Sequence, residues 1–178
     1  MTTRLATPLE ILSAAAFAAA KHRNQRRKDA EASPYINHPI TLAELLASAG
    51  IEDMDVLQAA LLHDTVEDTD TSFQELEKRF GKEVAGIVHE VTDNKSLPKE
   101  DRKRLQVEHA SDMSRAAKLV KLADKICNLS DVTSSPPVDW SLERKQQYFD
   151  WAKRVVDQMR GTHAVLEELF DAEYERRP

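Results

Sequence analysis

Residues 60–68 join an apolar helical stretch to side chains that can bind a metal ion or move a proton. The segment reads Ala-Leu-Leu-His-Asp-Thr-Val-Glu-Asp. On a helix, His63 and Glu67 lie one turn apart, as do Asp64 and Asp68, so the two pairs project from neighbouring faces. Three carboxylates at this spacing repel one another unless a cation or solvent compensates for their charge. The pattern indicates either a cation site or the solvated acidic end of a helix.

Two side chains elsewhere in the chain favour the cation site. His38 lies in Pro-Tyr-Ile-Asn-His-Pro, where the prolines restrict the backbone and the histidine begins a helix. Asp124 lies in the largely apolar segment 119–126, which should be buried, and a buried aspartate needs a partner. Taken singly, His38 is more often a capping or packed histidine, and Asp124 more often pairs with Lys121 or Lys125.

Taken together, these residues form a mixed set of nitrogen and oxygen ligands. The set comprises His38, His63, Asp64 and Asp124. Two imidazoles and two carboxylates suit Mn²⁺, Fe²⁺ or Zn²⁺ and leave positions for water and a phosphate oxygen. The sequence therefore predicts a metal site assembled from distant segments.

A run of basic residues precedes the His38 segment. It places five positive charges in eight residues, at Lys21, Arg23, Arg26, Arg27 and Lys28. Arginine binds phosphate through two parallel hydrogen bonds. The helix dipole also favours basic residues in a last turn that binds no ligand. A second basic cluster, within residues 95–104, is interpreted mostly as a solvated helix face.

Several single side chains have both a structural and a functional interpretation. Trp140 and Tyr148 could stack on a base, although such rings more often pack against the core. Trp151 is assigned to the core, and Cys127 is interpreted as a buried small hydrophobe and not as a nucleophile. The scattered histidines are interpreted as surface or structural residues: His22, His89, His109 and His163.

Helical periodicity and capping signals predict the elements that position these residues. Thr7-Pro8-Leu9-Glu10 and Ser72-Phe73-Gln74-Glu75 are capping boxes, and Asp53 or Asp55 can cap another helix. Gly50 and Gly81 are natural helix stops. The expected helices cover about 8–27, 39–49, a segment ending at Leu62, 73–80, 82–92, 100–109, 115–132, 141–160 and 162–175. No strand alternation and no repeat is visible, so we predict an all-α bundle of about eight to nine helices.

Length and composition exclude several classes of protein. A chain of 178 residues with 41% hydrophobic and 31% charged residues is one folded domain and not a disordered chain. A net charge of −6 disfavours a nucleic-acid coating protein. A single cysteine indicates a reducing compartment. No targeting or membrane-spanning segment is visible, so we expect a cytoplasmic protein without membrane or nucleic-acid partners.

The order His…His-Asp…Asp resembles the HD superfamily of metal-dependent phosphohydrolases. Six ordered blocks are similar to the alarmone hydrolases, the small stand-alone relatives of the bifunctional guanosine pentaphosphate enzymes. The blocks lie at residues 25–29, 34–39, 59–70, 90–93, 102–108 and 118–128. The resemblance extends from about Leu9 to Leu169 and implies that residues 1–178 form a single HD-type domain.

The resemblance also implies an activity and a set of site residues. Such proteins, the metazoan-type SpoT homologues, hydrolyse (p)ppGpp at the 3′ position, release pyrophosphate and GDP or GTP, and typically use Mn²⁺. Carried over by position, the metal ligands are His38, His63, Asp64 and Asp124, and the catalytic pair is Glu67 and Asp68. The implied substrate contacts are Arg27, Lys28, Tyr35, Asn128, Trp140 and Tyr148. Which of Glu67 and Asp68 acts as base and which as acid stays open.

The sequence departs from the family pattern at two places, and it leaves two alternative functions open. The loop 29–34 lacks the glycine that many relatives place before Pro-Tyr, and Ser130 replaces a frequent basic residue. One alternative is an HD phosphohydrolase that acts on NADPH or another nucleotide, because the metal centre recognises phosphate more firmly than base. The other is a non-catalytic nucleotide-sensing domain, which the intact set of ligands and carboxylates disfavours.

Overall fold

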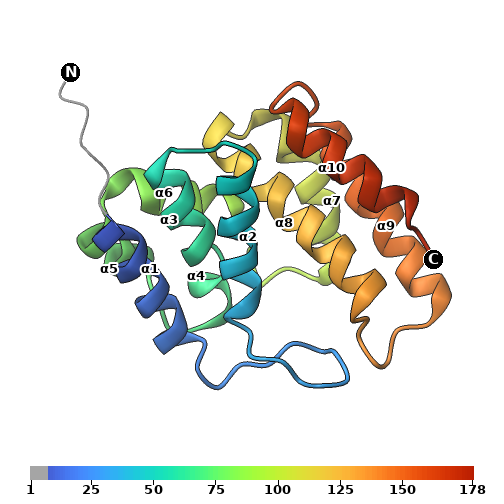
Figure 1. Ribbon diagram of the computed structural model, residues 1–178, viewed down its shortest axis with the longest axis horizontal. Coiled ribbons are helices and arrows are strands. Elements are labelled where there is room, and N and C mark those ends of the chain that lie inside the picture. Colours follow the sequence, from blue (N-terminus) through green and yellow to red (C-terminus); the bar gives the residue numbers. More distant parts are fainter. Residues whose placement is uncertain (1–7) are drawn as a thin grey trace.

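The structure is a computed structural model that describes residues 8–178, and the regular elements of this part of the chain are helices joined by loops (Figure 1). They are α1 (Pro8–Lys21), α2 (Asn37–Ser48), α3 (Met54–Leu62), α4 (Thr65–Asp68), α5 (Phe73–Phe80), α6 (Lys82–Val91), α7 (Lys99–His109), the 3₁₀ turn η1 (Ala110–Asp112), α8 (Arg115–Ser134), α9 (Leu142–Asp157) and α10 (Ala164–Glu175). Within these residues the β contact is an isolated bridge between Arg26 and Pro34. The predicted all-α fold is confirmed.

Local signals explain most of the helix ends. The Asp53 side chain accepts hydrogen bonds from the backbone N–H groups of Asp55 and Val56, so Asp53 is the cap of α3. The Ser72 hydroxyl accepts the N–H of Glu75 at the start of α5, as its capping box predicts. Gly81 follows α5 with φ of +94°, a left-handed conformation that costs a glycine little. Short polar signals therefore determine where these helices begin and end.

The first helix is shorter than predicted, because it ends at Lys21 and not near Arg27. After α1 the backbone bonds across a loop instead of along a helix. The Arg27 N–H donates to the Ser33 carbonyl, and the Tyr35 N–H donates to the Gln25 carbonyl. These long-range bonds replace the helical bonds that periodicity alone favours. Thr7, the first residue of the predicted capping box, lies outside the described residues.

Helix α8 is the central element. It packs against α2, α3 and α6, and also against α9 and α10. Figure 1 shows α2 and α3 on one side of α8 and α9 and α10 on the other. Its buried apolar residues include Leu119, Leu122 and Leu129. The middle of α8 therefore lies between two groups of helices, and its residues 119–123 are all buried.

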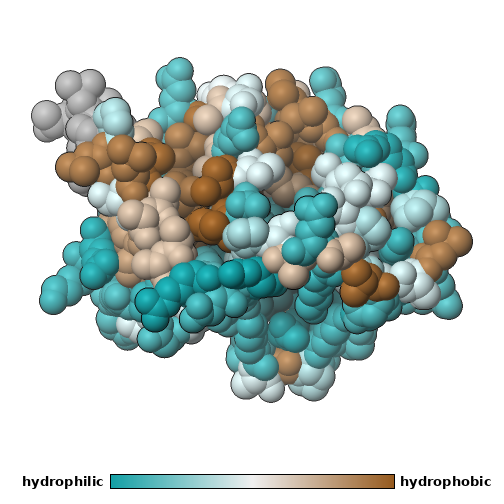
Figure 2. All heavy atoms as spheres, turned by 60° about the horizontal axis from the view of Figure 1, so that its bottom comes forward, coloured by the Kyte–Doolittle hydropathy of each residue, from teal (hydrophilic) through white to brown (hydrophobic). Residues whose placement is uncertain are grey.

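Apolar side chains are exposed near the start of α1. Leu9 and Leu12 on α1 are largely exposed. Figure 2, which turns the lower side of Figure 1 toward the viewer, shows an apolar patch beside the first residues and mostly hydrophilic side chains elsewhere on that face. Within residues 8–178, no helix combines the length and apolar character needed to cross a membrane.

Candidate functional site

The His63–Asp68 segment forms a break between two helices. Helix α3 ends at Leu62, and the single-turn helix α4 begins after Asp64. The Thr65 hydroxyl donates to the Leu62 carbonyl at 2.7 Å, and the Asp68 N–H donates to the Asp64 carbonyl at 2.9 Å. These bonds hold the break rigid. Helix α3 thus ends at Leu62, as predicted, and His63 and the acidic residues lie on the tight turn that follows.

His63 presents one ring nitrogen to the protein and the other to a buried cluster. Its Nδ1 lies 2.8 Å from the Ala60 carbonyl oxygen, and only a protonated Nδ1 can donate to that acceptor. Nε2 of the neutral ring is therefore unprotonated, which is the form that ligates a metal. The local backbone thus selects the tautomer.

Three of the four predicted metal ligands meet in one buried group. The ligand atoms of His38, His63 and Asp124 all lie within 4.8 Å of one another. His38 Nε2 is 3.2 Å from Asp124 Oδ1, and His63 Nε2 is 3.8 Å from the same oxygen. Helix α2, the end of α3 and helix α8 each supply one of these residues. Residues far apart in sequence therefore converge as predicted.

Asp64 lies at the edge of this group. Its Oδ2 is 2.9 Å from His63 Nε2, and the Tyr35 hydroxyl donates to the same oxygen. Tyr35, at the end of the loop after α1, thus contacts both Asp64 and the His38 ring. Asp64 therefore borders the three-residue group without belonging to it, and its carboxylate is held by Tyr35.

The donor atoms of the cluster fit a divalent cation. His63 Nε2 is buried and makes no hydrogen bond, although two carboxylates face it. A bare nitrogen lone pair next to carboxylate oxygens is repulsive unless a proton or a cation lies between them. Two imidazoles with carboxylate oxygens form the mixed ligand set of a transition-metal site. These residues could therefore hold one divalent metal ion.

The charges of the cluster stabilise one another. Burial by itself would lower the pKa of His63, but the Asp64 carboxylate raises it to about 9. Burial would raise the pKa of Asp64, and the neighbouring His63 holds it well below its usual range. Against the same effect of burial, Lys125 and His38 keep the pKa of Asp124 far below its usual value. Without a metal the cluster therefore contains ionised carboxylates around a protonated His63 ring, and a divalent cation would take the place of the Nε2 proton.

Asp124 has additional partners on its own helix. Lys125 Nζ lies 3.3 Å from Asp124 Oδ2, so this predicted ion pair is present together with the histidine contacts. Lys121 instead donates to the Val91 carbonyl. Asn128 donates through Nδ2 to Asp124 Oδ1 at 2.6 Å. The Asp124 carboxylate is thus fixed by a lysine, an amide and two histidines.

Glu67 and Asp68 have different surroundings although they are adjacent. Glu67 Oε2 accepts the backbone N–H of Asp93 at 3.1 Å, and Oε1 lies 3.9 Å from Arg102. Burial raises the pKa of Glu67. Asp68 accepts a hydrogen bond from Gln25 Nε2 at 2.9 Å and pairs with Lys95. Both oxygens of Asp68 are therefore occupied, whereas Oε1 of Glu67 accepts no hydrogen bond.

The second basic cluster, interpreted mostly as a solvated helix face, includes two members that pair with the acidic turn. Lys95 pairs with Asp68, and Arg102 lies against Glu67. Arg104 does belong to a solvated face, where it pairs with Asp101 and Glu108. No spacing along the chain distinguishes Lys95 and Arg102 from Arg104, because their partners Asp68 and Glu67 lie in a distant segment.

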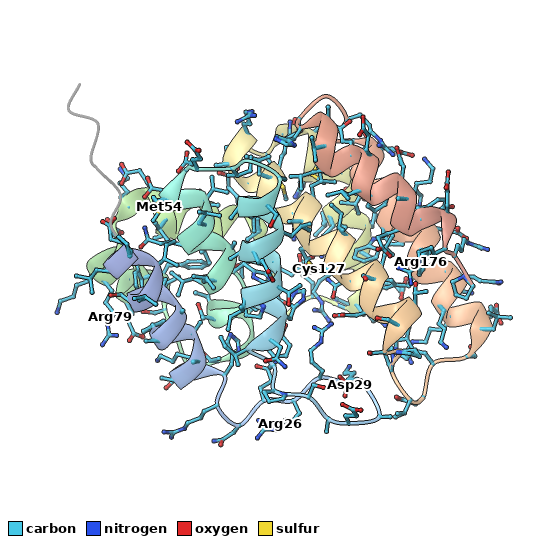
Figure 3. The ribbon with its side chains drawn as sticks, viewed as in Figure 1. Arg26, Asp29, Met54, Arg79, Cys127 and Arg176 are labelled. Atoms are coloured by element: carbon cyan, nitrogen blue, oxygen red, sulfur yellow. The ribbon has the colours of Figure 1, made fainter. Side chains whose placement is uncertain are left out.

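A cavity of about 760 Å³ opens beside the cluster. The loop after α1, the start of α2, helix α8 and helix α10 form its walls. Figure 3 labels Arg26 and Asp29 on the loop and Cys127 on α8, which line it from opposite sides. His38 and Asp68 also line it. The cavity volume suits a nucleotide-sized ligand.

Five of the six predicted substrate contacts line this cavity: Arg27, Lys28, Tyr35, Asn128 and Trp140. The sixth, Tyr148, does not. Its ring packs against Trp140, with ring centroids 5.2 Å apart, and it borders a smaller neighbouring hollow. Tyr148 therefore supports Trp140 from behind.

Other single residues have structural surroundings, as predicted. Trp151 is buried, and Lys125 lies 4.3 Å from the centroid of its ring. Cys127 is buried, and burial raises the pKa of its thiol to about 12. His22 is also buried, directly behind Tyr35 and Gln25. Sequence reasoning gave no role to Gln25, because a lone glutamine has no recognisable chemical spacing.

Comparison with known proteins identifies relatives of this chain. The family model described as HD domain matches residues 14–155. Guanosine-3′,5′-bis(diphosphate) 3′-pyrophosphohydrolase MESH1 of Xenopus tropicalis is 59% identical over 162 residues, which cover 90% of each chain. The Homo sapiens protein of the same name is 57% identical over 169 residues, 94% of each chain.

A solved structure is similar over nearly the whole fold. It is described as a metazoan ortholog of SpoT that hydrolyzes ppGpp and plays a role in starvation responses. Its TM-score is 0.93 and its sequence identity is 51%, with 97% of each chain covered. The likeness therefore includes the helices that form the histidine cluster.

Proposed function

The chain belongs to the HD domain family, and from this premise we propose that it hydrolyses the 3′-pyrophosphate of (p)ppGpp to GDP or GTP and pyrophosphate. The observation that supports this most is the buried His38–His63–Asp124 group beside a cavity of about 760 Å³. Relatives that match over 90% or more of their length are named for this reaction.

In this proposal His38, His63, Asp64 and Asp124 hold one divalent metal ion, Mn²⁺. The mixed imidazole and carboxylate set supports the choice of a transition metal. A divalent cation bound there lowers the pKa of a coordinated water and polarises a phosphoryl oxygen. Tyr35 and Asn128 act by orienting two of the ligands, since they hydrogen-bond to Asp64 and Asp124.

We assign the role of general base to Glu67. Its Oε1 accepts no hydrogen bond, whereas Oε2 is fixed by the Asp93 N–H. Burial raises its pKa toward neutrality, which favours proton transfer from water near physiological pH. Asp68 instead orients groups around the leaving pyrophosphate, because Gln25 and Lys95 occupy both of its oxygens.

The cavity wall supplies charge and a stacking surface for the substrate. Arg27 and Lys28 face the cavity, and Lys28 has no ion-pair partner among the described residues. Arg27 exchanges part of its pairing with Asp131 for a phosphate when substrate binds. Trp140 offers a ring to the guanine base, supported by Tyr148 behind it.

Two broader statements belong to the same proposal. Residues 1–178 form a single domain, which is supported by the family match over residues 14–155. The protein is cytoplasmic, which is supported by its one cysteine, a buried residue.

The test is a product assay with metal-free protein reconstituted with Mn²⁺. We expect ppGpp to yield GDP and pyrophosphate in equal amounts, separated by ion-exchange chromatography, and EDTA to abolish the reaction. NADPH and pppGpp are assayed in parallel. More efficient release of orthophosphate from NADPH would favour the other phosphohydrolase function, and tight nucleotide binding without turnover by any divalent metal would favour a sensing domain.

A further inference from the structure

We propose that His22 is a positioning residue that orients Asp68 through Gln25 and packs behind Tyr35, which holds Asp64. The inference extends the proposed function, on which its catalytic consequences rest. His22 directly follows α1, and its N–H donates to the Ala18 carbonyl at 2.9 Å. Its side chain is 2% exposed and lines no part of the cavity. It can act on the reaction only through other residues.

Two contacts connect His22 to the acidic turn. His22 Nδ1 lies 2.7 Å from Gln25 Oε1, and Gln25 Nε2 donates to Asp68 Oδ2 at 2.9 Å. On its other side the imidazole packs against the Tyr35 ring, with centroids 4.9 Å apart. The Tyr35 hydroxyl donates to Asp64 Oδ2. One buried ring therefore supports the partners of both aspartates.

Donor and acceptor chemistry determines the direction of the hydrogen-bond chain. An ionised carboxylate only accepts hydrogen bonds, so the Gln25 NH₂ must face Asp68 and the amide oxygen must face His22. An amide oxygen also only accepts, so His22 Nδ1 must have the proton. His22 thereby fixes the orientation of the Gln25 amide, because a flipped amide would place its oxygen against a carboxylate.

The other ring nitrogen supports the same assignment. His22 Nε2 is buried and has no hydrogen-bond partner among the described residues. A protonated Nε2 would be a buried N–H without an acceptor, which costs free energy, whereas a bare lone pair costs less. The site therefore selects the neutral tautomer with its proton on Nδ1.

His22 affects catalysis by fixing, through Gln25, the orientation of the Asp68 carboxylate. Without the His22 donor, the Gln25 amide can rotate, and Asp68 Oδ2 loses a fixed partner. A misplacement of about 1 Å of a group at a reacting centre costs up to about a hundredfold in rate. We expect the effect in kcat and not in KM, because Arg27 and Lys28 are unchanged.

The first experiment measures the tautomer directly and needs no activity. In ¹⁵N-labelled protein, two-bond ¹H–¹⁵N correlation spectra distinguish protonated from bare imidazole nitrogens, and His22→Phe identifies the signals. We expect a protonated Nδ1 and a bare Nε2 at neutral pH. A proton on Nε2 alone would overturn the proposal, because Gln25 could then not be oriented by His22.

The second experiment separates the donor from the ring. His22→Phe keeps a ring against Tyr35 and removes the donor, and His22→Asn places an amide N–H near the position of Nδ1. With ppGpp and Mn²⁺ we expect kcat of His22→Phe to fall about ten- to a hundredfold with KM within about twofold. His22→Asn should recover most of kcat. Equal losses in both variants, or none in either, would contradict the proposal.

A double-mutant cycle tests whether His22 acts through Gln25. Gln25→Met removes the amide, and we expect His22→Phe to cause no further loss of kcat in that background. A further tenfold loss of kcat in that background would overturn the proposed hydrogen-bond chain. His89→Phe, the same substitution at an exposed histidine on α6, is the matched control and should leave kcat and the melting temperature unchanged.

The outcomes distinguish this inference from the function on which it rests. If wild-type protein does not hydrolyse ppGpp, the proposed function fails, but the tautomer of His22 measured by NMR still tests the hydrogen-bond chain. If wild-type protein is active and His22→Phe, folded by its melting curve, has wild-type kcat, only the role of His22 fails.

Discussion

Adjacent carboxylates acquire different properties from their partners. Glu67 and Asp68 follow one another in sequence, yet burial raises the pKa of Glu67, while Asp68 is held by an ion pair with Lys95 and a hydrogen bond from Gln25. A carboxylate with a raised pKa and an oxygen free of hydrogen bonds is suited to accept a proton. One with both oxygens occupied is suited to hold other groups in place.

This difference predicts the effect of Glu67→Gln. The amide keeps the size of the side chain but cannot accept a proton, so kcat should fall by about a hundredfold or more. Bound Mn²⁺, measured by atomic emission, should stay at the wild-type level, because Glu67 lies outside the ligand group. Asp124→Asn is the comparison variant, and we expect it to lose both bound Mn²⁺ and activity. A Glu67→Gln protein with wild-type kcat would contradict the assignment of Glu67 as base.

The single cysteine gives a prediction about reactivity. Burial raises the pKa of Cys127 to about 12, so its thiolate fraction is very small at neutral pH. Because folding raises this pKa, the neutral thiol contributes stability that is fully present at pH values below the pKa of an unfolded cysteine. This contribution is lost as the pH rises toward 12. Iodoacetamide at pH 8 should modify native protein far more slowly than protein in guanidinium, as measured by mass spectrometry. Equal rates would show that the thiol is accessible.

At the scale of the elements, capping residues determine where several helices begin, and backbone hydrogen bonds within a loop shift the end of another helix. Ser72 and Asp53 cap their helices as the sequence predicts. The end of α1 is different, since residues 22–35 form a loop closed by the Arg27–Ser33 and Tyr35–Gln25 backbone bonds. This loop brings Arg27 and Tyr35 to the cavity, which a continuous helix to Arg27 would not do.

The connection between α9 and α10 gives a prediction about pH and stability. Arg160 binds Asp171 through two hydrogen bonds, and this pairing lowers the pKa of Asp171. The pair therefore stabilises the fold above the usual pKa of aspartate, and the stabilisation is lost as pH falls through the depressed value.

Because Asp171 is 53% exposed, we expect Asp171→Asn to cost less than about 1 kcal/mol at pH 7, measured by urea unfolding. The cost should vanish at strongly acidic pH. Glu168→Gln, on the same helix, is the matched control and should have no effect. A cost that persists unchanged in acid would exclude the ion pair as its cause.

At the scale of the whole molecule, the His38–His63–Asp124 group connects helices that lie far apart in the sequence. His38 is on α2, His63 follows α3, and Asp124 is on α8. A cation bound by all three crosslinks these helices in the folded state only, so it stabilises the fold by mass action.

We therefore expect Mn²⁺ at about a hundred times its dissociation constant to raise the melting temperature by about 5–10 °C. EDTA should reverse the shift, and His38→Ala should abolish it. Asp171→Asn is the control that should retain the full shift. An unchanged melting temperature in wild-type protein would contradict a metal site made from these helices.

The sequence by itself determined the helical class, most helix boundaries and the identity of the clustered residues. These follow from local periodicity, from caps such as Ser72 and from residue types such as His63 that are rare in a core without a reason. Such signals act over a few residues, and the amino-acid order contains them directly.

Only the tertiary structure decided which polar groups meet. The pairing of Lys95 with Asp68, the place of Tyr148 behind Trp140 and the chain from His22 to Asp68 join residues far apart or without a spacing of their own. Such contacts depend on how α8 packs between two groups of helices. Packing is a property of the whole core, so no short segment specifies it.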